Sequence, residues 1–293
     1  MSPSLPGHGR PRLVSIVVPV RNAAGVLADQ LAALAGQRYR GEREVVIVDN
    51  GSTDGSAEVA AAWSERLPLH VVSAPAPAGI NVARNAGAAA ARGELLVFCD
   101  ADDVVAPGWL AAMASTARWA DIVGGPLDEA TLNRPDQRAW RPPTPATALP
   151  RALRFLPYAP GGNLAVWAEV WRALGGFDER FSVGGTEIEF CWRAQLAGCR
   201  LGFASGAVVR VRHRASLPAL ARQFHRYGMA QAQLYAHFRA DGVPPSQARE
   251  ALRDWWWATR AMANRRQRPE ALRVAALRAG RLRGSARHRV LFP

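Results

Sequence analysis

The chain has 293 residues with 37 basic and 24 acidic side chains, which gives a formal net charge of +13, and every basic residue is arginine. The absence of lysine excludes a Walker-A phosphate loop, a pyridoxal-phosphate Schiff base and the strand lysine of protein kinases. With 49% hydrophobic and 21% charged residues, the composition is that of a globular protein with a sizeable core. Three scattered cysteines predict buried free thiols in a reducing compartment rather than a disulfide framework or a C-x-x-C metal site.

The first twelve residues are polar and rich in Pro and Gly, and they lack the apolar core of a secretory signal. We therefore expect the segment 1–12 to be disordered. No stretch of the sequence approaches the run of about 20 apolar residues that a membrane-spanning helix needs. These features predict a cytoplasmic protein that does not span a membrane.

Short apolar runs alternate with segments of helical spacing over residues 13–99. The predicted strands are Leu13–Val20, Glu44–Asp49, Leu69–Ser73 and Glu94–Cys99. The predicted helices between them are Ala23–Gly36, Ser56–Arg66 and Asn81–Arg92. Near-continuous Val, Ile and Leu in the strands indicate a parallel sheet covered on both faces, which is the α/β class. In such sheets ligands bind at the carboxyl ends of the strands.

The second half of the sequence changes character twice. Eight of the 21 prolines fall in the segment 126–160, which predicts a functional or mobile loop region without regular elements. The elements expected after it are a weak strand at Asn163–Val166, a helix at Glu187–Ala197, an apolar run at Leu201–Val209, and helices at Leu217–Arg239, Ser246–Arg265 and Pro269–Arg283. We therefore divide the chain into a domain 13–214, which includes the loop region, and a helical C-terminal extension 215–293.

An apolar strand ends in three carboxylates, Asp100, Asp102 and Asp103. Because side chains alternate along an extended chain, Asp100 and Asp102 should point the same way, about 6–7 Å apart. Two such groups can hold Mg²⁺ or Mn²⁺ against a diphosphate. The alternative is a solvated turn that caps a helix starting near Pro107, and D-x-D alone does not decide between the two.

Two further segments could meet a nucleotide. Asp49 ends a buried strand and could accept a hydrogen bond from the N3–H of uracil or thymine, or cap the strand end; Asp54 fits a helix cap better. Arg84 lies at the start of a helix, where a guanidinium and the helix N-terminus can both face phosphate, although a surface arginine is the alternative. The turn 19–25 lacks the G-x-G-x-x-G fingerprint, which disfavours a dinucleotide fold.

Four motifs in this order resemble the nucleotide-sugar domain of family-2 glycosyltransferases: V-S-I-V-V-P-V-R-N, V-I-V-D-N-G-S-T-D-G-S, A-R-N-A-G-A-A-A-A-R-G-E and F-C-D-A-D-D. Later segments agree, namely G-G-N-L-A-V at 161–166, L-G-G-F-D-E-R-F at 174–181 and G-T-E-I-E-F-C-W-R at 185–193. The resemblance covers about residues 13–238. It implies the GT-A fold, a nucleotide-sugar-binding sandwich with a mostly parallel central sheet, followed here by C-terminal helices.

The resemblance also implies a role for each matching position. The nucleotide-sugar site implied in this way consists of Pro19, Arg21, Asp49, Arg84, Asp100, Ala101 and Asp102. Arg84 would lie near the diphosphate, and Asp102 would be the metal ligand. His213 matches a histidine that completes the metal or diphosphate site in some relatives; a half-buried histidine between arginines is the alternative.

The family places its catalytic base on the second member of an E-D pair, which implies Glu187 here. The first member of the pair is replaced by Thr186. Glu189 is the second candidate for the base, although its spacing to Arg193 fits an intrahelical ion pair. A carboxylate suits an inverting transfer, because the base must deprotonate an acceptor hydroxyl opposite the departing nucleoside diphosphate.

These observations lead to three hypotheses of function. The first is an inverting glycosyltransferase that uses a UDP- or dTDP-sugar, Mg²⁺ or Mn²⁺, and a hydroxyl acceptor that is a saccharide, a lipid-linked molecule or a small molecule. The second, prompted by Thr186, is a catalytically degenerate nucleotide-sugar-binding protein. The third is a nucleic-acid-binding protein, but no nucleic-acid motif is present, so no nucleic acid is expected as a partner.

The basic charge is concentrated in the segment 260–293, which holds ten arginines against the single acidic residue Glu270. We expect a solvated or lipid-facing tail; on one face, ten arginines could hold the protein at the anionic inner membrane surface, at about 1 kcal/mol each. On the helix after His213, His225 and Arg226 could touch the diphosphate or the acceptor, or merely join helix to sheet. The run 255–257 is three tryptophans, so at least one ring should be exposed or at an interface, with a core or homodimer contact preferred to a membrane anchor.

Overall fold

A seven-stranded sheet forms the centre of the protein, whose computed structural model describes residues 8–293. The strand order is β3-β2-β1-β4-β8-β6-β9. The bounds are β1 Leu13–Val20, β2 Glu42–Asp49, β3 Leu69–Ser73, β4 Leu95–Phe98, β6 Ile122–Gly124, β8 Leu164–Trp167 and β9 Leu201–Phe203. Strands β1 to β4 pair in parallel, whereas β8 is antiparallel to both of its neighbours. The α/β class and the mostly parallel sheet are therefore confirmed.

A second, three-stranded sheet has the order β5-β10-β7. Its strands are β5 Val104–Val105, β7 Leu127–Asp128 and β10 Val209–Arg210. The register pairs Val209 with Val105 and with Leu127, so three distant parts of the chain meet here. This small sheet joins the end of the carboxylate motif to the start of the proline-rich segment.

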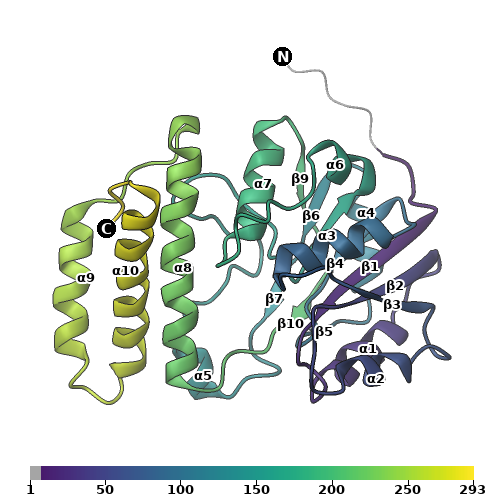
Figure 1. Cartoon of the computed structure of the whole chain (residues 1–293), viewed down its shortest axis with the longest axis horizontal. Coiled ribbons are helices and arrows are strands. Elements are labelled where there is room, and N and C mark those ends of the chain that lie inside the picture. Colours follow the sequence, from purple (N-terminus) through teal and green to yellow (C-terminus); the bar gives the residue numbers. More distant parts are fainter. Residues whose placement is uncertain (1–7) are drawn as a thin grey trace.

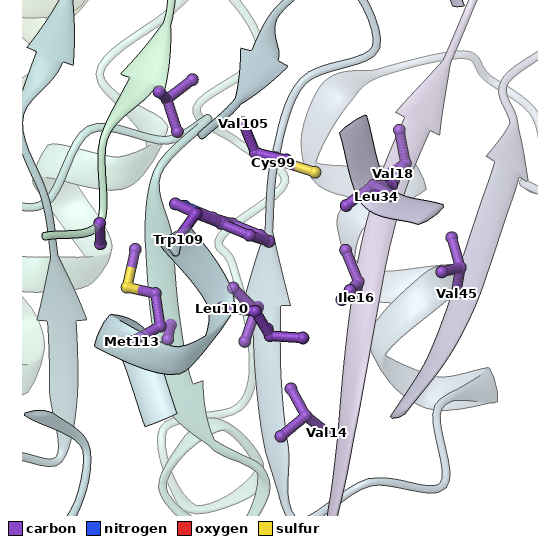
Figure 2. Packing of buried hydrophobic residues seen from close by; sticks show 14 of the residues in the cluster. Val14, Ile16, Val18, Leu34, Val45, Cys99, Val105, Trp109, Leu110 and Met113 are labelled. Atoms are coloured by element: carbon purple, nitrogen blue, oxygen red, sulfur yellow. The ribbon is translucent and has the colours of Figure 1, made fainter. Parts of the chain in front are cut away.

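Helices cover both faces of the central sheet (Figure 1). One face carries α1 Leu27–Ala35, α2 Ser56–Ala61 and α4 Trp109–Thr116, and the other carries α3 Ile80–Ala90, α6 Ala168–Ala173 and α7 Thr186–Leu196. Because strand side chains alternate, Ile16 packs into the first core while Val17 packs into the second. Figure 2 shows the first core, where Trp109 of α4 lies beside residues of β1 such as Ile16.

Helix ends depart from the prediction where polar turns replace the first helical residues. The helix predicted at 23–36 begins only at Leu27, because the backbone N–H groups of Ala23 and Ala24 donate to Ser56 and Asp54. We expected the proline-rich segment 126–160 to lack regular elements, but it does not. It contains β7 and a short helix, α5 Pro135–Ala139, which begins with a proline at a position where a backbone N–H is not needed.

The described part of the N-terminal segment is packed rather than free. The ring of His8 stacks on Trp167 with 4.5 Å between the ring centroids, and its Nε2 lies 2.7 Å from Oδ1 of Asp121. Residues 1–7, which the prediction of disorder also covers, lie outside the described residues.

Three long helices stand side by side at one end of the molecule (Figure 1). They are α8 Leu217–Phe238, α9 Ala248–Ala261 and α10 Arg268–His288, with a short 3₁₀ turn, η1 Arg239–Asp241, after α8. Glycines bring the backbones of α8 and α10 into contact. A Cβ atom at Gly280 would lie 2.0 Å from the carbonyl oxygen of His225, and one at Gly228 would lie 2.0 Å from that of Leu277.

We expected the arginine-rich segment 260–293 to be a solvated or lipid-facing tail. It is not a tail, because several of its arginines hold the helices together. Arg278 is 5% exposed and donates to Asp254 of α9 at 2.7 and 3.0 Å. Arg281 donates to Gln231 of α8 at 2.7 Å. Because Arg278 and Arg281 are directed to α9 and α8, the ten arginines do not form one common solvent-facing surface. Peripheral membrane contact and a homodimer remain predictions.

The tryptophan run behaves as predicted in one respect. Trp256 is 57% exposed, and the guanidinium of Arg260 lies 4.0 Å from the centre of its ring. Within residues 8–293, none of the helices combines the length and the apolar character needed to cross a lipid bilayer.

We expect Gly280→Ala to destabilise the protein by about 1–3 kcal/mol, because the added methyl group would force α10 away from α8. In a helix with free space the same change would stabilise by roughly 0.5–1 kcal/mol. Urea denaturation measures the difference, and Gly25→Ala is the control because a Cβ there meets nothing within 4 Å. A Gly280→Ala protein as stable as the wild type would show that the two backbones are not in contact.

The buried carboxylate of Glu44 connects the amino-terminal ends of β1 and β2 to the segment that precedes β4. It is 1% exposed and accepts hydrogen bonds from the Ser15 hydroxyl at 2.6 Å and from the backbone N–H and Nε of Arg92 at 2.6 and 2.8 Å. Burial by itself raises the pKa of Glu44, but the hydrogen bonds from Ser15 and Arg92 outweigh it and bring the pKa below its ordinary value of 4.5. The ionised form is thus stabilised by folding.

We therefore expect Glu44→Gln to lose about 1–3 kcal/mol of unfolding free energy at neutral pH. A lowered pKa contributes stability above the pKa of the unfolded state, and that contribution disappears as the pH falls through the folded-state pKa. The gap between wild type and Glu44→Gln should therefore close as the pH falls below the ordinary glutamate pKa of 4.5 and through the lowered folded-state pKa. Denaturation curves at several pH values test this, with the exposed Glu65→Gln as the control; a gap independent of pH would contradict it.

Candidate active site

The carboxyl ends of the central strands border a cavity of about 1100 Å³, which we call the donor cavity. Seven of the residues implied by the resemblance line it: Pro19, Arg21, Arg84, Asp100, Ala101, Asp102 and Glu187. Asp49 and His213 are not among its lining residues. The side chain of Asn50, which follows Asp49, does line the cavity. Most of the candidate site is thus brought together by the turns after β1 and β4 and by the starts of α3 and α7.

A chain of hydrogen bonds connects the carboxylate motif to the candidate base. Arg84, which is 4% exposed, extends from α3 and places Nη2 3.2 Å from Oδ1 of Asp100 and Nη1 3.1 Å from Oγ1 of Thr186. The Thr186 hydroxyl donates to Oε2 of Glu187 at 2.8 Å. Thr186 can do this because a hydroxyl both accepts and donates. Arg84 is therefore a buried, paired residue and not the surface arginine of the alternative interpretation.

Two glycines shape the backbone that delivers Thr186 and Glu187. Gly184 and Gly185 have φ angles of +143° and +70°, which residues with a side chain rarely adopt. Gly185 immediately precedes α7. Glu187 consequently lies in the first turn of α7, where the helix dipole favours a negative charge.

The three carboxylates after β4 crowd one another. Burial, with added repulsion from Asp100 and Asp102, raises the pKa of Asp103 to about 8, and its Oδ1 accepts a hydrogen bond from the Arg212 backbone at 2.9 Å. Burial and Asp100 also raise the pKa of Asp102, which Arg214 opposes from 3.5 Å. The alternative role as a cap is not seen, because α4 begins without a side-chain cap. A cation would relieve this accumulation of negative charge.

The residues present fit a divalent cation that is held in part by the substrate. Among residues 8–293, no group of three or more His, Cys, Asp or Glu side chains is arranged to hold a metal ion. Mg²⁺ sites at phosphate-transfer centres are commonly built from one or two carboxylates together with phosphate oxygens, so Asp102 beside a diphosphate would be sufficient.

His213 lies in an adjoining cavity that Asp102 also lines. Its Nε2 is buried without a hydrogen-bond partner and lies 3.8 Å from Oε1 of Glu129. Burial lowers the pKa of His213, and Arg141 lowers it further, which keeps the imidazole neutral and able to bind a metal. The neutral imidazole of His213 therefore suits the predicted role as a second ligand, although its Nε2 faces Glu129 and His213 does not line the donor cavity.

Two acidic residues from the sequence analysis have structural roles. Asp54 accepts hydrogen bonds from the backbone N–H groups of Ser56 at 3.1 Å and of Ala24 at 3.0 Å in the turn before α2, although the N-cap residue of that helix is Gly55. Asp49 accepts from the Ser52 backbone through Oδ1 at 3.0 Å. No described residue donates to Oδ2 of Asp49, so one oxygen stays free.

The second candidate for the base, Glu189, is a buried ion-pair partner. It is 1% exposed and binds Arg193 through both carboxylate oxygens, at 2.5 and 3.1 Å. Arg193 in turn donates to the carbonyl groups of Leu174 and Gly176. Glu189 lines neither the donor cavity nor the adjoining one. The geometry therefore favours Glu187 as the base.

The first half of α8 contributes side chains to the site, of which Gln223 and Tyr227 were not singled out from the sequence. Arg226 lines the donor cavity and donates to the carbonyl of Val183 at 3.3 Å, whereas the backbone of His225 faces α10. Tyr227 and Gln223 were missed; Gln223 Nε2 donates to the Tyr227 hydroxyl at 2.9 Å, and both side chains line the donor cavity and its neighbour. Their four-residue spacing places them on one face of α8.

The adjoining cavity, which we call the acceptor-side cavity, has a volume of about 680 Å³. Its walls come from the carboxylate motif, the loop 151–154, helix α8, the segment 244–246 and the end of the chain near Phe292. Glu187 and Tyr227 line both cavities. A group bound on either side could thus reach Glu187.

Comparison with known proteins agrees with this architecture. The family described as Glycosyl transferase family 2 matches residues 15–166. The pre-mycofactocin glycosyltransferase of Mycobacterium tuberculosis is 28% identical over 263 residues, covering 86% of this chain and 53% of that protein. Glycosyltransferase AglE of Haloferax volcanii is 29% identical over 226 residues, covering 76% of this chain and 74% of that protein. This chain spans about half the length of the mycobacterial relative.

Solved structures share the fold at low sequence identity. The mannosyltransferase PcManGT of Pyrobaculum calidifontis, in complex with GDP-Man and Mn²⁺, aligns with a TM-score of 0.61 at 21% identity over 94% of this chain and 87% of that one. TarS 1–349 of S. aureus, in complex with UDP, aligns with a TM-score of 0.54 at 17% identity over 94% and 91% of the two chains. The chain belongs to Glycosyl transferase family 2, and the expected GT-A fold is confirmed.

Proposed function

We propose that this protein is an inverting glycosyltransferase that transfers a sugar from a nucleoside-diphosphate sugar of the UDP or dTDP type to an acceptor hydroxyl. The observation that carries the proposal is the hydrogen-bonded series Asp100–Arg84–Thr186–Glu187 inside the donor cavity. It links the residues suited to a diphosphate with a carboxylate suited to proton abstraction. Residues 13–214 would bind the donor, and the helices of 215–293 would form part of the acceptor side.

In this mechanism Glu187 accepts the proton of the acceptor hydroxyl. The hydroxyl oxygen forms a bond to the anomeric carbon from the face opposite the leaving group, and the bond from that carbon to the β-phosphate oxygen breaks with its electron pair. No covalent intermediate with the protein is needed. Arg84 and the first turn of α3 would lie near the diphosphate, where positive charge favours the departing oxygen.

The proposed cofactor is Mg²⁺ or Mn²⁺, with Asp102 as the ligand and His213 as a second ligand. The cation supplies positive charge that stabilises the leaving diphosphate. Asp102, a crowded carboxylate, and His213, whose Nε2 is buried without a hydrogen-bond partner, both line the acceptor-side cavity, which supports this assignment. The mannosyltransferase with GDP-Man and Mn²⁺ that shares the fold gives the same expectation.

The pyrimidine part of the proposal depends on Asp49. Its free Oδ2 could accept the N3–H of a uracil or thymine, with Pro19 and Arg21 along the base and ribose. The acceptor would enter the acceptor-side cavity; it is a saccharide, a lipid-linked molecule or a small molecule. We further propose a cytoplasmic location. Peripheral contact with an anionic membrane and formation of a homodimer are part of the same proposal.

A panel of nucleotide sugars tests the proposal most directly. Thermal denaturation of the protein with Mn²⁺ and each of the UDP-, dTDP- and GDP-sugars should give the largest rise in Tm with a pyrimidine donor, because a ligand that binds the native state stabilises it in proportion to its affinity. Slow hydrolysis of the same donor should follow. Stabilisation without hydrolysis would favour the degenerate nucleotide-sugar-binding protein, and no stabilisation by any nucleotide sugar would refute both.

A further inference from the structure

The acceptor-side cavity has a basic wall that the donor cavity does not share. The charged residues that line only the acceptor-side cavity, apart from His213, are Glu129, Glu250, Arg141, Arg151, Arg154 and Arg281. Arg154 is paired with Glu250 at 2.6 Å. Glu129 accepts from the hydroxyl and backbone N–H of Thr144 at 2.9 and 3.2 Å. Among these residues four arginines face two carboxylates, whereas the residues shared with the donor cavity add four carboxylates and two arginines.

Arg141 is the partly buried arginine of this wall whose hydrogen-bonding capacity is least used; Arg151 also forms one hydrogen bond within the described residues, but it is exposed. Within residues 8–293 its guanidinium forms no ion pair, and its one hydrogen bond goes to the neutral side chain of Gln223. Its Nε is buried and has no hydrogen-bond partner. Burial lowers the pKa of Arg141, and the charges of Arg214 and Arg273 add to this while Tyr227 and Glu129 oppose it. A guanidinium has five N–H donors, so most of them remain for a ligand.

The surroundings hold Arg141 in a defined orientation. Its guanidinium lies 5.3 Å from the centre of the Phe224 ring, and that of Arg273 lies 5.4 Å from the same ring. Gln223, the partner of Arg141, donates in turn to Tyr227, which lines the cavity beside Glu187. A fixed, planar fork of donors is the arrangement that proteins use to bind phosphate or carboxylate through two oxygens.

The loop 151–154, which also lines this cavity, has a strained backbone. Leu153 and Arg154 are consecutive non-glycine residues with φ angles of +50° and +56°, a region that such residues adopt at an energetic cost. Strain of this kind clusters at ligand sites. The ion pair of Arg154 with Glu250 holds the loop in this conformation next to the apolar side chains of Leu234 and Phe292. The cavity is thus lined by apolar side chains as well as by arginines.

We propose that the acceptor carries an anionic group, a phosphate or a carboxylate, which Arg141 binds in the acceptor-side cavity while the acceptor hydroxyl reaches Glu187. The inference rests on the proposed function, because it takes Glu187 as the base that both cavities share. Arg141 does not line the donor cavity, which separates this anion from the diphosphate of the donor.

Calorimetric titration with three small probes tests the inference on the full chain. Phenyl phosphate, benzoate and the neutral benzyl alcohol are each titrated into protein alone and into protein saturated with Mn²⁺ and the nucleoside diphosphate that stabilises it most. We expect phenyl phosphate or benzoate, but not benzyl alcohol, to bind, and Arg141→Gln to weaken that binding by about tenfold or more. Arg141→Lys should retain part of it, since the charge is kept. Arg134→Gln is the control, because Arg134 is exposed, paired with Asp136 and outside both cavities.

Three results would overturn the inference. The first is the absence of saturable binding of both anionic probes to the wild type at concentrations on the order of 10 mM. The second is equal probe affinity in the wild type and in a folded Arg141→Gln protein. The third is a loss of nucleoside-diphosphate affinity in Arg141→Gln, which would assign Arg141 to the donor. A wild type that binds no nucleotide would instead refute the proposed function, while the titrations of protein alone would still measure the anion site.

Discussion

Glu187→Gln is expected to abolish sugar transfer while leaving the protein folded and able to bind the donor. General-base catalysis by a positioned side chain contributes about 10²–10⁴-fold to a rate, and glutamine cannot accept the proton. In the wild type the Thr186 hydroxyl donates to Oε2 of Glu187 at 2.8 Å. Glutamine has the same size as glutamate and keeps a carbonyl oxygen that can accept this hydrogen bond. Initial rates of donor consumption and thermal denaturation with nucleotide measure the two effects separately.

Glu189→Gln is the matched control for this experiment. Glu189 lies two residues further along α7 and is paired with Arg193 behind the cavity wall. Removing one partner of a buried ion pair costs about 3–5 kcal/mol of stability, so this variant should unfold earlier but keep its activity per folded molecule. A Glu187→Gln protein that kept more than about a tenth of the wild-type rate would exclude Glu187 as the base.

Asp102→Asn is expected to remove the response to divalent cations and to slow transfer by about 10²–10³-fold, the usual cost of losing one group that stabilises developing charge. The same substitution should not destabilise the protein without ligand. Burial and the charge of Asp100 raise the pKa of Asp102, so at neutral pH its ionised form is disfavoured by folding, and a neutral amide removes that cost. Activity and stability should therefore change in opposite directions.

Thermal denaturation with and without Mn²⁺, in the presence of nucleoside diphosphate, measures the metal response directly. Asp54→Asn is a suitable control, because Asp54 accepts hydrogen bonds from the turn before α2 and does not line the donor cavity. We expect this control to lose stability and to keep its response to Mn²⁺. A full stabilisation of Asp102→Asn by Mn²⁺ would contradict the role of Asp102 as a metal ligand.

The first half of the fold could be predicted because its signals are local. Strand β1 is a continuous apolar run whose alternate residues, such as Ile16 and Val17, enter opposite cores, and this pattern can be recognised without knowing the neighbouring strands. A strand was expected at Asn163–Val166, where β8 lies, but its antiparallel direction and the two-residue strands of the small sheet could not be predicted, because they are defined by partners more than thirty residues away in the sequence. Short strands carry too few residues for a period to appear.

The donor side of the site could likewise be inferred from motifs, whereas the acceptor side could not. Asp102 and Glu187 belong to segments that resemble a family pattern. Arg141 lies in a proline-rich segment without a pattern, and it enters the cavity only because that segment folds back against Gln223 of α8. The arginines of α10 were misjudged for a related reason: the number of charges predicts solvation, while the glycines that allow α10 to approach α8 decide which arginines are buried.

The glycine contact between α8 and α10 has a consequence for engineering acceptor preference. Gln223 and Tyr227 face the cavity from α8, while Gly228 on the same helix meets the backbone of α10. Replacing α8 alone with that of a relative would therefore change the cavity side chains and, at the same time, the surface of α8 that contacts α10. Acceptor preference should be exchanged between members of this family when α8 and α10 are replaced together, because the backbone of each helix fits against the backbone of the other.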